Sequence, residues 1–187
     1  MRARPLLILA ASLVLALGLA ACGNKQAHPH FADNEGFYVD AGGITYQVQL
    51  SRELNQYNVE DMAYLKGLAP GTPPLRPDEE WFAVFLAARN QTQSPLTTAH
   101  NFDMVDTQGN RYNAIPLDPA LNEYVWEPTL LKPNGTQPVP DSVAYFGPTQ
   151  GGLLLFRINV SAYSNRPLIL EIRGPVGQVW ARVSIDL

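Results

Sequence analysis

Alternating apolar and polar residues mark three segments of the chain as β-strands with one buried face. In an extended strand successive side chains point to opposite faces, so an apolar residue at every second position indicates a half-buried strand. Residues 44–51, 167–172 and 178–187 follow this rule. In the first segment the positions expected to face the core are Ile44, Tyr46, Val48 and Leu50.

Residues 80–90 are apolar on both faces. The segment contains Trp81, Phe82, Val84, Phe85 and Leu86. Its composition allows a helix. The aromatic residues, the proline-rich loop expected at 70–77 and the polar exit at 90–95 favour a central strand buried on both sides.

Shorter apolar segments predict the remaining strands. Residues 37–39 could open the domain as a short strand, and residues 102–105 and 152–158 predict two more. Gly109 can supply a positive φ, so residues 106–110 are predicted to form a hairpin turn. Many short strands with turn signals between them are typical of an antiparallel sandwich of about seven to eight strands.

Helical signals are few. Residues 58–67 could form one short helical turn with Asn58 as its N-terminal cap. Seven prolines in residues 116–148 exclude long regular elements there, although apolar residues in this segment must pack somewhere. The predicted fold class is therefore all-β, with one domain over residues 37–187.

The N-terminal segment has the parts of an export signal. Arg2 and Arg4 give it a positive start, and residues 6–21 form an apolar and small-residue run of 16. That run is shorter than the about 20 residues of a membrane-spanning helix. It ends in Leu19-Ala20-Ala21-Cys22, which resembles the bacterial lipobox. An ordinary secretory signal and an uncleaved anchor are the alternatives.

The lipobox resemblance implies cleavage before Cys22 and lipid attachment to this residue. Residues 1–21 are then a lipoprotein signal peptide, and the mature protein is held on the extracytoplasmic face of a bacterial membrane. Residues 22–36 are expected to be a lipidated N-terminus and flexible tether. His28 and His30 lie in this tether and could hold a metal ion, but no third ligand is near, so a solvated linker is the preferred interpretation.

Composition limits the classes of partner. Cys22 is the one cysteine, so no disulfide can form within the chain, and a blue-copper site lacks its thiolate once this cysteine is lipidated. Residues 1–21 contain Arg2 and Arg4 and no acidic residue, so removing them leaves 11 basic against 17 acidic side chains. An acidic domain is a poor match for nucleic acid, and no nucleic-acid partner is expected.

Two segments also carry a family resemblance. The run from Trp81 to Asn90, followed by residues 106–112 with the pattern Asp-x-x-Gly-Asn-x-Tyr, resembles a family of bacterial lipoprotein domains of unknown function. Residues 153–156 and 165–168 look like the late part of that pattern. The resemblance covers about residues 37–187 and implies an immunoglobulin-like sandwich, related in fold to secreted immunoprotective antigens of mycobacteria. It implies no catalytic residue.

Catalytic and metal-binding patterns do not emerge from the residues. His100 is the one histidine of residues 37–187, and no Gly-x-Ser-x-Gly nucleophile elbow accompanies it. Asp103 and Asp106 could act as paired carboxylates, but Asp106 is better explained as organising the hairpin turn. The acidic residues 78–80 are better explained as a solvated strand entry. No enzyme activity, cofactor or metal site is predicted.

The long irregular segment holds the best candidates for binding. Tyr124 and Trp126 have the amphipathic character enriched at interfaces, and Arg166 would join them if it lies at the same end of the sandwich. The alternative is that both aromatic residues cover the core or a sheet edge. The preferred hypothesis is a tethered, non-enzymatic module that binds an envelope protein or has a structural role. A ligand- or lipid-binding lipoprotein is the alternative, and an unrecognised enzyme ranks third.

Overall fold

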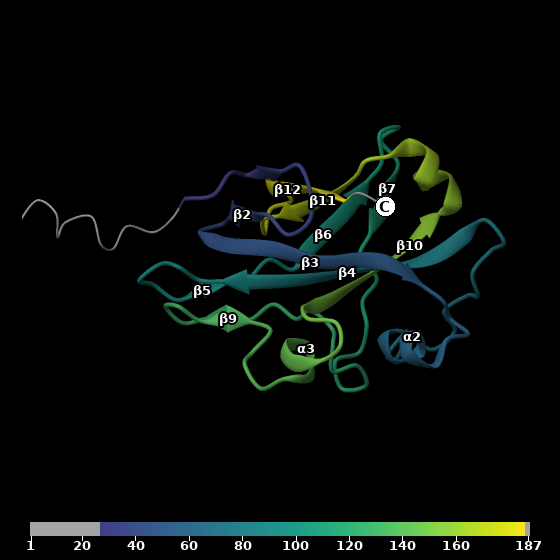
Figure 1. The fold of residues 1–187 in the computed structure, drawn as a ribbon, viewed down its shortest axis with the longest axis horizontal. Helices are drawn as coiled ribbons and strands as arrows, with labels where there is room; N and C mark the ends of the chain where they lie inside the picture. The colour runs from purple at the N-terminus through teal and green to yellow at the C-terminus, as the bar shows by residue number, and fades with distance from the viewer. Residues whose placement is uncertain (1–26, 186–187) are drawn as a thin grey trace, which may run out of the picture.

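Residues 27–185 are described by the computed structural model, and their strands form two main sheets that pack face to face (Figure 1). The first sheet, in order, is β1 (Phe31–Ala32), β12 (Val179–Ile185), β11 (Leu168–Arg173), β6 (Asn101–Val105) and β7 (Arg111–Asn113). The second, in order, is β10 (Gly152–Asn159), β4 (Glu79–Arg89), β3 (Ile44–Leu54) and β2 (Tyr38–Ala41), with β9 (Thr136–Gln137) also paired to β4. A small third sheet joins β5 (Leu96–Thr97) to β8 (Leu130–Leu131).

The predicted immunoglobulin-like antiparallel β-sandwich is confirmed. Among the described residues, seven strands have four or more residues and β7 has three, as expected for seven to eight main strands. β1 pairs with β12 in parallel, and the other paired strands run antiparallel. The segment at 80–90 is the central strand β4, and residues 106–110 join β6 to β7 as the predicted hairpin turn.

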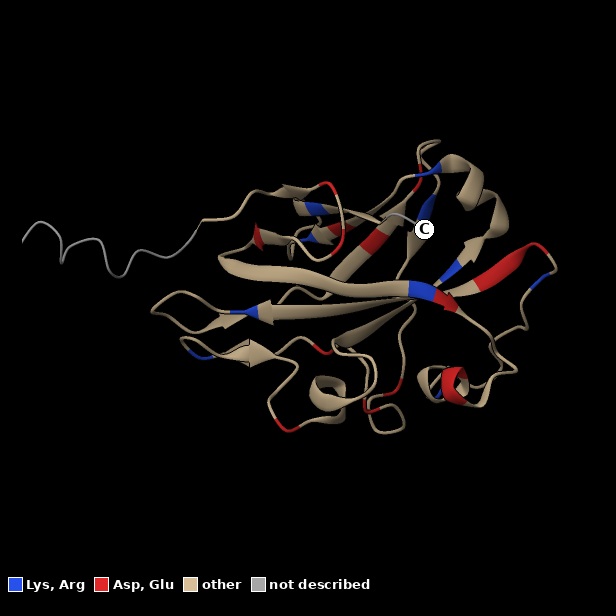
Figure 2. Cartoon of the chain, viewed as in Figure 1, with Lys and Arg blue, Asp and Glu red and all other residues tan. Residues whose placement is uncertain are grey.

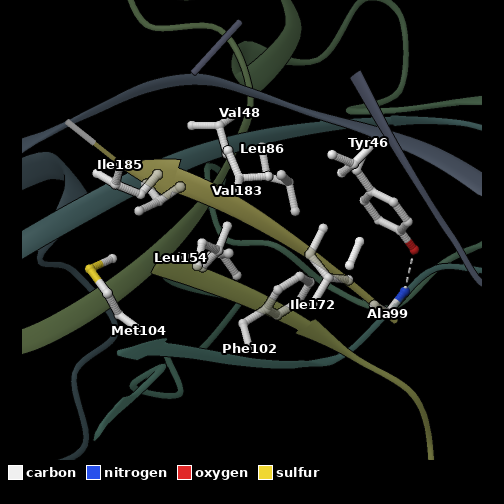
Figure 3. Packing of buried hydrophobic residues seen from close by; sticks show 14 of the residues in the cluster. Tyr46, Val48, Leu86, Ala99, Phe102, Met104, Leu154, Ile172, Val183 and Ile185 are labelled. Atoms are coloured by element: carbon white, nitrogen blue, oxygen red, sulfur yellow. Dashed lines mark hydrogen bonds between the residues drawn. The ribbon is translucent and has the colours of Figure 1, made fainter. Parts of the chain in front are cut away.

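The core lies between the two main sheets. On β11 and β12 six alternating apolar residues are buried, namely Leu168, Leu170, Ile172, Ala181, Val183 and Ile185, whereas Val179 at the start of β12 is only partly buried. They belong to one cluster with Tyr46, Val48 and Leu86 of the second sheet (Figure 3). The Tyr46 hydroxyl accepts a hydrogen bond from the Ala99 backbone N–H at 2.8 Å, and burial raises the pKa of Tyr46 to about 12.

The predicted alternation along β3 holds from Ile44 to Val48 and then reverses. The register between β3 and β4 shifts between Val48 and Leu50. An extra residue at such a bulge turns the side chains that follow to the opposite face. Leu50 is therefore 39% exposed, and the prediction that it faces the core is wrong.

A second apolar cluster covers part of the outer face of the second sheet and explains why β4 is buried on both sides. The cluster consists of Leu54, Tyr64, Trp81, Ala83, Phe85, Leu117, Leu153 and Leu155. Tyr64 comes from the short helix α2 (Val59–Tyr64) and packs edge-on against Phe85, with ring centroids 5.1 Å apart. The predicted cap is confirmed, because the Asn58 side-chain oxygen accepts a hydrogen bond from the Glu60 backbone N–H.

Irregular chain covers the outer edge of β10. The Ile115 backbone N–H donates to the Leu155 carbonyl at 2.7 Å. The Leu153 N–H donates to the Tyr124 carbonyl at 2.7 Å, and the Leu153 carbonyl accepts from the Trp126 N–H at 2.9 Å. These hydrogen bonds satisfy backbone groups that an edge strand would otherwise present to other chains.

The folded domain begins earlier than the predicted boundary at residue 37. Residues 31–32 form β1, the Asp40 N–H donates to the Pro29 carbonyl at 3.0 Å, and the His30 Nδ1 atom lies 2.5 Å from the Asp40 carbonyl oxygen. Residues 28–32, expected to be tether, thus contact β2 and β12, and residues 35–36 contact β3. No alternation of polar and apolar residues marks this segment, because it is held by a short strand pairing, a few hydrogen bonds and the single buried Ala32.

The predicted signal peptide and Cys22 lie outside the described residues. Within residues 27–185, no helix has the length and apolar character needed to cross a membrane.

Candidate binding groove

A groove of about 390 Å³ lies on the outer face of the second sheet, beside the short helix α3 (Val143–Phe146). Its floor includes Thr45, Gln47 and Gln49, which occupy alternate positions of β3 and so share the face opposite to the core. Tyr38 of β2 lines one side, and Tyr145 of α3 lines the other. A volume of this size falls within the range of about 300–1,000 Å³ that is typical of small-molecule sites.

Strand register places the floor residues side by side. Tyr38 of β2 is the cross-strand neighbour of Gln47 on β3. In the next row Thr45 of β3 pairs with Arg89 of β4, which pairs with Thr136 of β9. Because the Cβ atoms of such neighbours are about 4.5–5.5 Å apart, these side chains form a continuous polar surface.

A chain of hydrogen bonds fixes two of the floor amides. The Gln47 Nε2 group donates to the Gly36 carbonyl at 2.5 Å, so its Oε1 atom must be the end available as an acceptor. The Gln49 Nε2 group donates to that Oε1 atom, also at 2.5 Å. The Gly36 carbonyl therefore sets the orientation of both amides, and Gln49 retains its own Oε1 atom as an acceptor.

Asp40 supports the floor from the edge and does not line the groove. The Thr45 hydroxyl donates to Asp40 Oδ1 at 2.6 Å, and the Gln91 Nε2 group donates to the Thr45 hydroxyl at 3.1 Å. The other carboxylate oxygen, Oδ2, accepts from the His28 backbone N–H at 3.1 Å. Docking of the N-terminal segment and orientation of Thr45 thus depend on one carboxylate.

Two tyrosines give the groove aromatic flanks. Tyr38 is 49% exposed and Tyr145 is 38% exposed. The His28 ring lies 5.2 Å from the Tyr38 ring in a tilted arrangement, and Tyr145 packs edge-on against Phe146 at 4.8 Å. Both tyrosines are therefore held by a neighbouring ring while part of their surface stays open to solvent.

The groove has little charge. Apart from its tyrosines, its titratable lining residues are His28 and Arg89, and no Asp or Glu lines it. In Figure 2 acidic residues gather on the loop after β1, around α2 and at the start of β4, whereas α3 and the first part of β3 are uncoloured. Within residues 27–185, no group of three or more His, Cys, Asp or Glu side chains is arranged to hold a metal ion. The groove can donate and accept hydrogen bonds and pack against apolar surface.

Tyr124 and Trp126 lie at the covered edge of β10, outside the groove lining. Trp126 is only 7% exposed, and its Nε1–H donates to the Ala99 carbonyl at 2.8 Å. Tyr124 packs edge-on against Tyr64 at 4.8 Å, and burial raises its pKa. The structure thus gives both residues the position of a core and edge cover, which is the alternative interpretation of the sequence.

Arg166 does not join them. It follows the 3₁₀ helix η1 (Val160–Asn165), which leaves the far end of β10, whereas Tyr124 and Trp126 flank Leu153 near its start. The Arg166 Nε–H donates to the Tyr163 carbonyl at 2.8 Å. The three candidate residues therefore do not form one surface.

The acidic candidates have structural partners. Asp106 accepts hydrogen bonds from the backbone N–H groups of Gln108 and Asn110, as expected for a residue that organises the hairpin turn. Burial would raise the pKa of Asp106, but hydrogen bonds from the Asn110 and Asn165 side chains outweigh it and lower this pKa. Asp103 lies 2.7 Å from Arg111. His100 is exposed.

Sequence reasoning missed the groove itself. The alternation predicted for residues 44–51 also implies that Thr45, Gln47 and Gln49 face outward, as they do, but polar residues on an outward face usually indicate ordinary solvent-exposed surface. The groove exists because α3 and β9, which are more than 80 residues away in the sequence, lie beside that face. No local pattern encodes this approach.

Comparison with known proteins identifies the fold alone. No protein-family model and no curated protein matches the chain. Among solved structures, the yjhA protein from Bacillus subtilis matches with a TM-score of 0.54 and 12% identity, over 82% of this chain and 99% of that one. An uncharacterized β-sandwich protein from Clostridium difficile 630 matches with a TM-score of 0.42 and 10% identity, over 88% and 99%. At 12% identity, the match with the Bacillus subtilis protein shows a shared fold and nothing further.

Proposed function

We propose that this chain is a lipid-anchored, non-enzymatic binding module of the bacterial cell envelope, and that it recognises its ligand in the groove over β3. The anchor is lipid on Cys22, as the lipobox resemblance implies, and the address is the extracytoplasmic face of a membrane. The resemblance of the segments at 81–90 and 106–112 to bacterial lipoprotein domains, and through them to mycobacterial secreted antigens, supports this address.

The groove is the observation that carries the proposal. It combines floor amides whose orientation is fixed by backbone contacts with two partly exposed aromatic rings. Groups that are already oriented lose less conformational entropy when a ligand binds, so such a surface favours recognition. The groove replaces Tyr124, Trp126 and Arg166 as the candidate site.

Two other modes of binding receive less support. Partner binding along the edges of the second sheet is disfavoured. Backbone groups of β10 already bond to irregular chain, and on β2 the Asp40 N–H already donates to the Pro29 carbonyl. Storage of a lipid between the sheets would need an apolar cavity, but that space holds fully buried side chains such as Phe82, Phe156 and Leu170. A polar ligand on the outer face remains the best-supported mode.

Crosslinking in living cells tests the proposal. A photoreactive amino acid replaces Tyr145 in the full-length chain, and a matched variant carries it at Tyr57, which is 84% exposed and does not line the groove. We expect a discrete adduct from position 145 and none from position 57. No adduct from position 145, or the same adducts from both positions, would count against a binding role for the groove.

A further inference from the structure

We infer that the ligand of this groove is a neutral glycan strand, rich in hydroxyl and N-acetyl groups. This inference rests on the proposed binding function and names the chemistry of its ligand. It is carried by three properties of the lining: its charge, its hydrogen-bonding groups and its aromatic flanks.

Charge excludes the strongly ionic classes of ligand. A cationic ligand would need carboxylates, and none lines the groove. A phosphate or polyanion is usually met by several Arg or Lys side chains, often in bidentate geometry, whereas Arg89 alone is available here. An uncharged polar ligand fits the lining without leaving an unpaired charge.

The hydrogen-bonding groups suit hydroxyl and acetamido groups. Five glutamines and two threonines line the groove, namely Gln47, Gln49, Gln91, Gln137, Gln150, Thr45 and Thr136. Thr45 and Gln137 are buried and already hydrogen-bonded within the protein, so a ligand would meet mainly the other five. A glutamine amide offers two N–H donors and one acceptor oxygen, and a sugar hydroxyl can donate and accept at the same time. Gln49 sits at the end of the chain of hydrogen bonds that begins at the Gly36 carbonyl, so its amide presents both functions in a fixed orientation.

The aromatic flanks suit the apolar faces of pyranose rings. A pyranose has polar edges and a face of C–H groups, and such a face packs well on a tyrosine ring. Tyr38 and Tyr145 flank the polar floor from opposite sides. A strand lying along the groove could therefore place ring faces on the tyrosines and its hydroxyl groups on the glutamines.

A peptide is the competing occupant and fits less well. Extended peptides commonly bind by adding a strand to a free sheet edge. β3 is paired by β4 along its length and by β2 over Ile44–Gln47, where the Gly36 N–H also donates to the Val48 carbonyl. β4 is paired by β3 on one side and by β10 and β9 on the other. The groove floor thus offers side chains and few free backbone groups.

Titration of the full-length lipidated protein in detergent micelles tests the inference. The probes are tetra-N-acetylchitotetraose, cellotetraose and a neutral pentapeptide of alanine, and calorimetry measures their affinity. We expect at least one of the two glycans to bind with a dissociation constant of about 1 mM or lower, and the peptide to bind more weakly. Gln49→Leu and Tyr145→Ala should each weaken glycan binding about tenfold or more.

Matched controls separate the groove from the rest of the surface. Gln108→Leu changes an exposed glutamine in the β6–β7 turn, and Tyr57→Ala changes an exposed tyrosine before α2; neither should alter glycan affinity. Gln49 is exposed and Tyr145 is partly exposed, so both groove variants are expected to fold, which their melting temperatures will verify.

The outcomes distinguish the inference from the proposed function. Failure of both glycans to bind, or tighter binding of the peptide with the same dependence on Gln49, overturns the glycan assignment. If the photoreactive group at position 145 still gives its discrete adduct, the groove remains a binding site for another class of ligand. If that adduct is also missing, the proposed function fails with the inference.

Discussion

At the scale of single residues, Asn90 shows how one buried amide holds two loops together. It has no exposed surface, its Nδ2 group donates to the carbonyls of Ser94 and Leu131, and its Oδ1 atom accepts from the Thr92 N–H. Alanine at this position would leave the buried Leu131 carbonyl without this partner, at a cost of about 1–3 kcal/mol, and would also remove the partly buried hydrogen bonds to residues 92 and 94. We therefore expect Asn90→Ala to lower the free energy of unfolding by about 2–3 kcal/mol in urea denaturation.

The neighbouring Gln93 provides the control, because its side chain is exposed in the same loop. Gln93→Ala should change the free energy of unfolding by no more than about 0.5 kcal/mol. Equal stability of the two variants would show that the Asn90 hydrogen bonds do not stabilise the fold.

Glu80 is a second residue whose environment makes a testable prediction. Burial raises its pKa above the ordinary value of 4.5, the Tyr163 hydroxyl lowers it in part, and the nearby Glu53 raises it again. Between the ordinary pKa and the raised one, the folded state keeps a proton that the unfolded state has already released. Glu80 therefore makes the protein less stable as pH rises through this range. We expect Glu80→Gln, which cannot ionise, to gain in melting temperature over the parent as pH rises from about 4 to about 7.

The difference in melting temperature between the parent and Glu80→Gln reports on Glu80, because the other titratable groups are the same in both proteins. Melting temperatures of parent and Glu80→Gln are measured by circular dichroism across this pH range. A difference that stays constant with pH would mean that the pKa of Glu80 is the same in the folded and unfolded states.

At the scale of elements, the bulge in β3 decides which apolar side chains are buried. Val48 has no exposed surface, whereas Leu50 is 39% exposed because the register shift lies between them. We expect Val48→Ala to lower the free energy of unfolding by about 2 kcal/mol and Leu50→Ala by less than about 1 kcal/mol. Chemical denaturation measures both. The opposite order, which simple alternation predicts, would mean that β3 has no bulge.

How far the sequence predicts this structure depends on whether a signal is local. The apolar composition of β4 and the alternation of apolar and polar residues along β11 and β12 predict these strands correctly, because the apolar residues mark the faces that are buried. β1 escapes detection, since two residues pairing with β12 leave no period. The register shift after Val48 is likewise invisible, because it depends on how β3 aligns with β4.

The candidate site is less predictable than the fold for the same reason. Tyr124 and Trp126 are predicted as binding candidates because their amphipathic character is enriched at interfaces, yet in the structure they lie along the β10 edge and cover it. Nothing in the sequence marks Gln47 and Gln49 as binding candidates, because polar residues on an outer strand face are common. Only the approach of α3 turns that face into a groove.

At the scale of the whole molecule, packing of the N-terminal segment shortens the tether. The predicted tether ran from residue 22 to residue 36, but residues 28–32 contact β2 and β12. Five residues, 23–27, then join Cys22 to the folded domain. A fully extended chain spans at most about 3.6 Å per residue, so the domain would lie within about 20 Å of the lipidated cysteine. His28, which lines the groove, is the first residue after this link, so the groove would lie close to the membrane surface.

This arrangement depends on the anchor, which a single substitution tests. Cys22→Ser removes the thiol of the proposed lipid attachment, and we expect it to abolish both incorporation of labelled palmitate and the mature, membrane-retained form. Burial of each acyl CH₂ contributes about 0.8 kcal/mol, so the proposed acyl chains would account for membrane retention of a domain that is itself acidic. Gly23→Ser is the matched control, since it changes the neighbouring residue, keeps the thiol and should label and fractionate as the parent does. If the Cys22→Ser protein is still processed and still sediments with membranes, something other than lipid on Cys22 holds the domain there. The short link would then no longer set the distance between the groove and the membrane.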